Sequence, residues 1–472
     1  MRKVFLGLSL LTFCLGVCGA QTFRNFELSS TPTTTCPTSP LCYNNAAEPA
    51  IRSDPAGNFF SSSEDGLGAG TLAWRSLDGG LNYTALNSPN GVSQATNNTF
   101  EPGGGDTDVA VAPARNSRGF YNVYVASLSL ANVDVSTSQD QGGTWSLNPT
   151  SATLPGDDRE WIAADGPSKV CISYREVAGT QLVVNCSLDA GATFTQIGNV
   201  YDANHQAFAT FNAAVGNLAI DPNNHIIYQT FAAVANSAEA ATCSNCNLHV
   251  VWMGVSTDGG KTFTDYPVYI NPDVTASYNH QFTNVSVDRA GNVYSVYTDN
   301  HNVYYSFSTS HGQTWSGPFK VNKGAAATAI FPWSVAIAPG KIDIVYYGSS
   351  YFDGVNPPDS YPSTASWYAY FAQNLAATTK GSSFTQVAAT PIVHFGGVCE
   401  SGVTCSGNRD LFDDFGVAAS PVTGMASIIY SDDQYTNTSV SPPSPSCTPA
   451  ATNTGSCDHT SIATQIKGKG IN

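Results

Sequence analysis

The octapeptide Ser256-Thr-Asp258-Gly-Gly260-Lys-Thr262-Phe263 is the most informative stretch of the sequence, because the chain repeats it. Related segments occupy residues 76–83, 138–145, 187–194 and 308–315, the last with Ser in place of Asp. In such a segment the Asp can accept backbone amides, the Gly can adopt a positive φ, and the aromatic ring can pack under the turn. The repeat therefore predicts a hairpin turn that is used several times.

A second repeat lies between these turns and consists of short strands with alternating residue types. There are seven of them, at residues 50–54, 108–112, 161–165, 217–221, 284–288, 334–338 and 416–420. The second position is aliphatic, and the third is Ala or Ser in every unit but the first, where it is Arg52. Alternation with period two places these residues on opposite faces of a strand. Small residues are suited to innermost strands that converge on an axis.

The two repeats together predict an all-β fold, a single seven-bladed β-propeller of four-stranded antiparallel blades. The seventh unit lacks a fourth strand after residues 460–465, and residues 22–28 form an unassigned strand near the N-terminus. We expect this segment to supply the outer strand of the last blade and so to close the ring. A six-bladed ring is the alternative, since the sixth unit keeps only a degenerate turn near residues 378–381.

The repeated turn resembles the Asp box of the sialidase (BNR-repeat) superfamily of β-propellers, whose known sialidases have six blades. In that family the box joins the third and fourth strands of a blade at the rim, so the resemblance implies a structural role for these Asp residues. The family's catalytic machinery is a Tyr nucleophile, an Asp acid/base and three Arg that hold the substrate carboxylate. The resemblance covers most of the chain as fold, but no Tyr can be assigned to the nucleophile position.

Composition excludes several classes of function. Charged residues make up 11% of the chain, and 19 basic against 35 acidic residues give a net charge of −16. Such a surface repels phosphate backbones and anionic membranes, so we expect neither as a partner. Nucleotide-binding loops and zinc-protease motifs are absent from the sequence, and no cofactor or metal is predicted. We expect a monomer.

The N-terminus reads as an export signal over residues 1–20, followed by one propeller domain over residues 21–472. A lipoprotein anchor through Cys18 is the alternative to a secreted or periplasmic protein, although the bulky Val17 precedes this Cys. The ten other Cys occur as near neighbours, namely Cys36/Cys42, Cys171/Cys186, Cys243/Cys246, Cys399/Cys405 and Cys447/Cys457. An even count in an exported chain predicts disulfides. Cys171 and Cys186 lie symmetrically about a turn at residues 178–179, so a hairpin would place them opposite each other.

A binding funnel is expected on the face where the innermost strands begin, because three long loops and an insert at residues 391–408 lie there. Polar residues at the strand entrances supply the candidate chemistry. The candidate catalytic residues are Asp106, Asp108, Asp413, Asp414 and Glu160, and the candidate substrate-binding residues are Arg52, Arg159, Arg409, His280 and Trp333. Arg52 would hold a substrate in the funnel or form an internal ion pair that plugs it.

The resulting hypothesis is a secreted, sialidase-like glycoside hydrolase that cleaves extracellular glycans with funnel carboxylates and arginines. Two alternatives remain open at this point. A non-catalytic propeller would bind a glycan or protein through aromatic and amide groups, and a polysaccharide lyase would use Tyr or His as a base. An enzyme of the first kind requires two carboxyl groups across the funnel with shifted pKa values.

Overall fold

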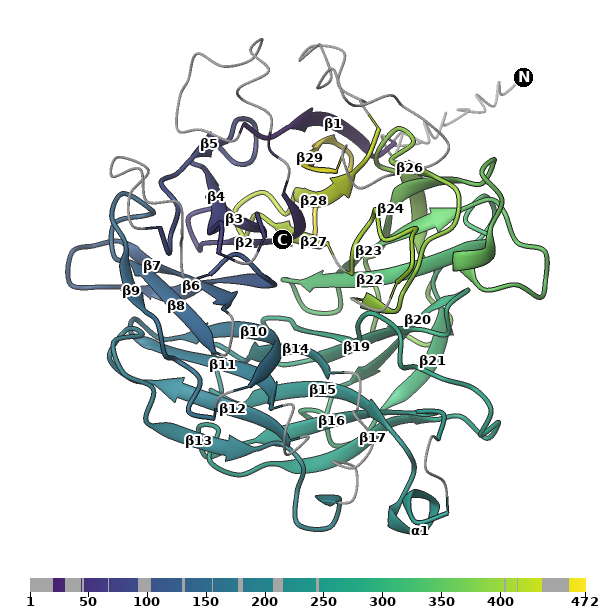
Figure 1. Cartoon of the computed structure of the whole chain (residues 1–472), viewed down its shortest axis with the longest axis horizontal. Coiled ribbons are helices and arrows are strands. Elements are labelled where there is room, and N and C mark those ends of the chain that lie inside the picture. Colours follow the sequence, from purple (N-terminus) through teal and green to yellow (C-terminus); the bar gives the residue numbers. More distant parts are fainter. Residues whose placement is uncertain are drawn as a thin grey trace, which may run out of the picture.

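The computed structural model describes residues 20–29, 44, 46–66, 68–91, 103–129, 132–154, 156–176, 181–206, 215–242, 246–402, 405–413, 415–434 and 458–472. These residues form seven antiparallel sheets around a common axis, a seven-bladed β-propeller with very little helix (Figure 1). The seven-blade prediction is confirmed, and the six-bladed alternative is wrong.

The first three blades are regular four-stranded sheets in chain order. Blade 1 contains β2 (Ala47–Ser53), β3 (Phe59–Glu64), β4 (Thr71–Ser76) and β5 (Thr84–Ala85). Blade 2 contains β6 (Thr107–Arg115), β7 (Tyr121–Leu128), β8 (Val133–Ser138) and β9 (Ser146–Asn148). Blade 3 contains β10 (Asp157–Asp165), β11 (Lys169–Glu176), β12 (Gln181–Ser187) and β13 (Gln196–Asn199).

The next three blades follow the same order, with additions in their connections. Blade 4 contains β14 (Val215–Ile220), β15 (Ile227–Ala233), the short helix α1 (Ser237–Ala240), β16 (Val250–Ser256) and β17 (Thr264–Ile270). Blade 5 contains β18 (Asn284–Val287), β19 (Val293–Thr298), β20 (Val303–Ser308) and β21 (Ser316–Lys320). Blade 6 contains β22 (Thr328–Ala336), β23 (Ile342–Ser349), the 3-10 turn η4 (Pro358–Ser360), β24 (Ser366–Asn374), β25 (Thr385–Ala388) and β26 (His394–Phe395), which also pairs with β24.

The innermost strands of successive blades contact one another and form a closed ring around the axis. The aliphatic residue of each repeat packs into the core, as at Ile162, which is 1% exposed. Its small neighbour Ala163 remains partly accessible, as do Ala219 and Ala336 in other blades. In these blades the alternation seen in the sequence therefore separates the core face of the inner strand from its axial face.

The repeated turns join the third and fourth strands of blades 1 to 5. In blade 4 the Asp258 carboxylate accepts the backbone amide of Thr262 at 3.0 Å and its hydroxyl at 2.6 Å. Burial alone would raise the pKa of Asp258, but these hydrogen bonds lower it to about 2. In blade 5 the hydroxyl of Ser310 replaces the carboxylate and accepts the amide of Thr314 at 3.0 Å.

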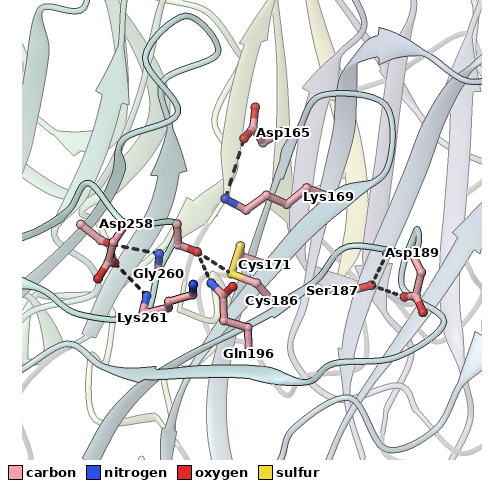
Figure 2. Close-up of a disulfide and its surroundings, with 12 residues drawn as sticks. Asp165, Lys169, Cys171, Cys186, Ser187, Asp189, Gln196, Asp258, Gly260 and Lys261 are labelled. Atoms are coloured by element: carbon pink, nitrogen blue, oxygen red, sulfur yellow. Dashed lines mark hydrogen bonds and ion pairs between the residues drawn. A yellow bond between two sulfur atoms is a disulfide. The ribbon is translucent and has the colours of Figure 1, made fainter.

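The predicted disulfide between Cys171 and Cys186 is present, and it joins two residues that face each other directly across β11 and β12. Figure 2 shows the turn that carries Asp258 lying beside this disulfide, although the turn belongs to the next blade. Gln196 donates a hydrogen bond to the Gly259 carbonyl in that turn. The turn therefore also joins neighbouring blades. A second disulfide, between Cys399 and Cys405, closes a loop in the insert after blade 6.

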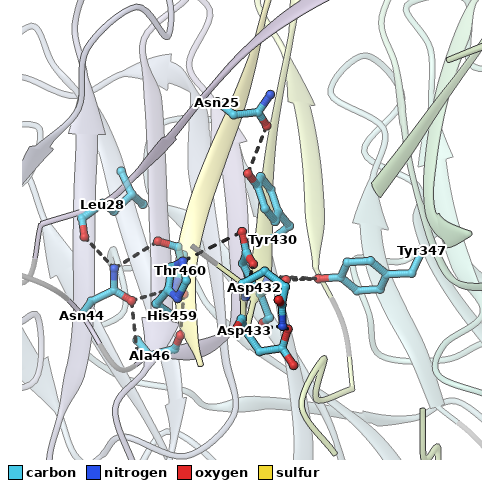
Figure 3. Close-up of polar contacts among 12 residues, drawn as sticks. Asn25, Leu28, Asn44, Ala46, Tyr347, Tyr430, Asp432, Asp433, His459 and Thr460 are labelled. Atoms are coloured by element: carbon cyan, nitrogen blue, oxygen red, sulfur yellow. Dashed lines mark hydrogen bonds and ion pairs between the residues drawn. The ribbon is translucent and has the colours of Figure 1, made fainter. Parts of the chain in front are cut away.

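Blade 7 closes the ring with strands from both ends of the chain. It contains β27 (Gly416–Ala419), β28 (Ala426–Asp432) and β29 (His459–Lys467), and β1 (Thr22–Glu27) pairs with β29 as the outer strand. Asn44 reinforces this closure, because its side chain donates to Leu28 at 2.6 Å and accepts the amide of Thr460 at 2.7 Å (Figure 3). The predicted N-terminal closing strand is confirmed.

We predict that Asp258→Ala lowers the free energy of unfolding by roughly 1 kcal/mol, because it removes the acceptor that organises the turn and the site is largely exposed. The pKa of Asp258 is lower in the folded chain than its ordinary value of 3.8. The carboxylate therefore stabilises the fold above about pH 4, and this contribution disappears as the pH falls towards about 2. Urea unfolding at several pH values measures the effect.

Asp258→Ser is the matched control, because Ser310 occupies the same position in the fifth turn. It should retain more stability than the Ala variant at pH 7. Equal unfolding midpoints for the wild type and Asp258→Ala would contradict this account of the turn.

Candidate functional site

Two charged side chains are aimed at the axis by irregularities at the start of the innermost strands. Glu48 lies in a register shift at the beginning of β2, and Arg159 lies in one at the beginning of β10. Both adopt a left-handed backbone, with φ of 48° and 58°. Such bulges redirect a side chain out of the regular alternation, and they are common beside functional sites.

Glu48 bridges two guanidinium groups that come from blade 3 and from the segment before blade 7. One carboxylate oxygen accepts Arg409 at 2.9 Å, and the other lies 3.2 Å from Arg159. Arg159 also lies 3.5 Å from Asp106, and Arg409 lies 3.0 Å from Asp413. The guanidinium of Arg159 packs 4.2 Å from the ring of Phe282. This network holds residues from several blades together at the mouth of the axis.

Three carboxyl groups converge in this network. Oxygen atoms of Glu48, Glu64 and Asp106 lie within 4.8 Å of one another. Burial and the charge of Asp106 raise the pKa of Glu64 to about 8, while Arg409 and Arg159 oppose the shift. Burial and the neighbouring acids also raise the pKa of Glu48. Burial and the repulsion between neighbouring acids therefore favour the protonated form of Glu64 at neutral pH.

A cavity of about 730 Å³ opens beside this cluster, on the face that also carries the loop between β23 and β24. Its lining is polar. The lining residues are Asp106, Asp158, Arg159, Arg175, Val215, Asn279, His280, Gln281, Phe282, Asn300, Pro357, Asp359, Val398, Glu400, Ser401, Gly402, Arg409 and Asp413. Residues 357 and 359 come from the β23–β24 loop, and the residues between 398 and 402 come from the insert, so two of the four segments expected to shape a pocket contribute to its described lining.

Five of the ten candidate residues line this cavity, namely Asp106, Asp413, Arg159, Arg409 and His280. His280 lies in the connection between blades 4 and 5, and its Nδ1 lies 2.9 Å from the carboxylate of Glu400, which belongs to the insert. Burial alone would lower the pKa of His280, but the Glu400 carboxylate raises it above its usual value. Asp414 lies outside the described residues.

The other four candidates lie apart from the cavity lining, which argues against the roles expected for them. Asp108 is completely buried, and its oxygens accept the amide of Ile162 at 3.1 Å and pair with Arg52 at 3.0 Å. Arg52 therefore forms the internal ion pair, and its guanidinium lies 5.1 Å from the centroid of the Trp333 ring. Trp333 is 4% exposed and Glu160 is fully buried, so neither side chain can meet a ligand in the cavity.

Sequence reasoning missed several residues of the site. Glu64 and Arg175 lie at or near the ends of β3 and β11, which are second strands of their blades. Because a second strand ends where the first begins, polar residues at that point belong to the same face. That signal was present in the sequence. Asp359 and Glu400 come from long loops, whose course no periodicity predicts.

Three groups of side chains in the described part of the chain bring potential metal-ligand atoms within 4.8 Å: Glu48/Glu64/Asp106, Asp202/His205/Asp265 and His394/Asp410/Asp433. In the first group Glu48 already pairs with the guanidinium groups of Arg159 and Arg409, and Arg159 also lies 3.5 Å from Asp106. In the last, both ring nitrogens of His394 are engaged, by Asp433 at 2.7 Å and by the Gly397 carbonyl at 3.0 Å. In the first and the last group, ligand atoms that a cation would need are therefore already engaged by other partners.

No protein-family model matches the chain, and no curated protein matches its sequence. Solved structures resemble it weakly. The α-L-arabinofuranosidase Arb93A from Fusarium graminearum matches with 10% identity over 94% of this chain and 97% of that chain, with a TM-score of 0.47. The α-L-arabinanase from Penicillium chrysogenum matches with 11% identity over 94% and 98%, and a TM-score of 0.45. The NanB sialidase from Streptococcus pneumoniae matches with 9% identity over 94% and 70%, and a TM-score of 0.42.

We predict that Glu48→Met lowers the free energy of unfolding by about 3 kcal/mol, because it leaves two guanidinium groups at the axis without their shared acceptor. Glu48→Gln should cost less, since its amide oxygen still accepts one of them. Calorimetry of the two variants and the wild type measures the difference. A Met variant as stable as the wild type would mean that the network does not hold the blades together.

Proposed function

We propose that the axial cavity is the active site of a glycoside hydrolase. The observation that carries this proposal is the cluster of Glu48, Glu64 and Asp106 at the edge of a polar cavity, in which burial raises the pKa of Glu64 to about 8. Glycosidic bond cleavage requires a carboxylic acid that stays protonated at working pH beside a second, ionised carboxyl group. The cluster supplies the first of these conditions.

Asp106 is the member of the cluster that lines the cavity, and it would deliver the proton to the leaving glycosidic oxygen. The proton would come from Glu64, whose pKa burial and the charge of Asp106 raise to about 8, and Asp106 would relay it. Arg159, 3.5 Å from Asp106, would stabilise the carboxylate that forms as the proton leaves. Asp106 would then be the catalytic acid, with Glu64 acting through it.

Asp413 would provide the second carboxyl group. It lines the same cavity, and Arg409 holds one of its oxygens at 3.0 Å. An ionised carboxylate in this position can stabilise the positive charge that develops on the sugar ring, or activate a water molecule. Arg409 binds both Asp413 and Glu48, so the two carboxyl groups of the proposed mechanism, Asp106 and Asp413, belong to one network.

The alternative functions fit the lining less well. A binding propeller would present aromatic rings, but Phe282 is the one aromatic residue among the described lining residues, beside five carboxyl groups. A lyase needs a neutral base, whereas Glu400 favours the protonated form of His280. A sialidase-type nucleophile is also missing from the described lining, which contains no Tyr.

We further propose that the enzyme works outside the cell. The disulfides Cys171–Cys186 and Cys399–Cys405 are typical of oxidising compartments. None of the helices in the described part of the chain is long and apolar enough to cross a membrane. The export signal expected at residues 1–20 lies almost entirely outside the described residues and remains a prediction, as does the lipoprotein alternative through Cys18.

We predict that Asp106→Asn lowers kcat/KM by about 10²–10⁴-fold, because it removes the group that delivers the proton. The release of reducing ends from a panel of glycans provides the assay. Asp189→Asn, in the rim turn of blade 3, is the matched control and should leave turnover unchanged. A glycan cleaved equally well by both variants would rule out Asp106 as the acid.

The pH dependence gives a further test. Because the acid must carry its proton, turnover should fall as the pH rises through about 8, the pKa of Glu64. Glu64→Gln should lower turnover and move this alkaline limb of the pH profile. An unchanged alkaline limb in this variant would show that Glu64 does not share the catalytic proton.

A further inference from the structure

Every basic side chain in the described lining of the cavity already faces a carboxylate. These side chains are Arg159, Arg175, Arg409 and His280. Arg159 and Arg409 share Glu48, and each has a second acid at 3.5 Å or less. Arg175 pairs with Asp158 from the neighbouring strand, and His280 pairs with Glu400.

Acidic groups outnumber the basic ones at this site. Five carboxyl groups line the cavity, namely Asp106, Asp158, Asp359, Glu400 and Asp413, and Glu48 lies directly behind them. The whole chain carries a net charge of −16. The cavity therefore has no surplus of positive charge, and the surrounding field repels anions.

An anionic sugar would have to place its carboxylate beside the acids that already pair with these arginines and this histidine. Such like-charge contacts cost several kcal/mol. A neutral sugar faces no such cost, because its hydroxyl groups can donate to the paired carboxylates and accept from the remaining guanidinium N–H groups. Asn279, Gln281 and Asn300 add amide groups that suit hydroxyls.

We infer that the cavity is built for a neutral, hydroxyl-rich glycan and discriminates against glycans that carry carboxylates. This inference rests on the proposed function in that it assigns the substrate class of the same cavity. It differs from the resembled family, in which three Arg hold the carboxylate of the substrate. In this reading Asp158 and Glu400 determine specificity, because each neutralises a cation that would otherwise attract an anionic sugar.

The test measures binding and cleavage separately. Purified full-length protein is applied to an array of neutral oligosaccharides and of uronate- or sialate-containing ones, and the affinities for the best hits are then measured by calorimetry. We expect binding to neutral glycans only. Asp158→Asn, which frees Arg175, and Glu400→Gln, which frees His280, should each shift the ratio of anionic to neutral affinity by roughly tenfold towards the anionic glycans.

The outcomes separate this inference from the proposed function. Neutral binding without cleavage would support the substrate class and reject the hydrolase. Cleavage of an anionic glycan that depends on Asp106 would support the hydrolase and overturn the substrate class. Binding of anionic glycans by the wild type, no binding to any neutral glycan, or an unchanged affinity ratio in both variants would each overturn the inference.

Discussion

The convergence of seven inner strands on one axis is the constraint on which the rest of this structure depends. At the mouth of the axis the blades meet through Glu48, which accepts hydrogen bonds from both Arg159 and Arg409. Buried charges are tolerated only when they are paired, so the acidic and basic groups must be arranged together. One network therefore both ties residues from different blades together and sets the electrostatics of the cavity beside it.

The same network explains why a protonated acid can lie next to the proposed substrate site. Two guanidinium groups do not balance the carboxyl groups that crowd around Glu48, and burial favours the neutral form of the acids. Burial and the charge of Asp106 raise the pKa of Glu64 to about 8, and Asp106 itself lines the cavity. Glu64, which would hold the proton, and Asp106, which would pass it on, therefore have oxygen atoms within 4.8 Å of each other. The proposed catalysis and the pairing of the buried charges would both follow from this one arrangement.

The architecture was predictable because it is repeated. Seven alternating strands and five related turns predicted seven blades, and the unassigned strand at residues 22–28 predicted the closure with β29. The site was only partly predictable. Asp106, Arg159 and Arg409 followed from their position at strand entrances, whereas the course of the loops that carry Asp359 and Glu400 has no periodic signal. Arg52 interrupted a repeat of small residues, but that irregularity marked an ion pair with Asp108 in the channel wall.

Infrared difference spectroscopy tests the central claim most directly, because it detects protonated carboxyl groups in the folded protein. The account predicts a protonated carboxyl band at pH 7 that disappears as the pH rises through about 8 and that is weakened in Glu64→Gln. If the wild type and this variant give the same spectra across that range, with no protonated carboxyl assignable to the axial cluster, the proposed proton reservoir does not exist.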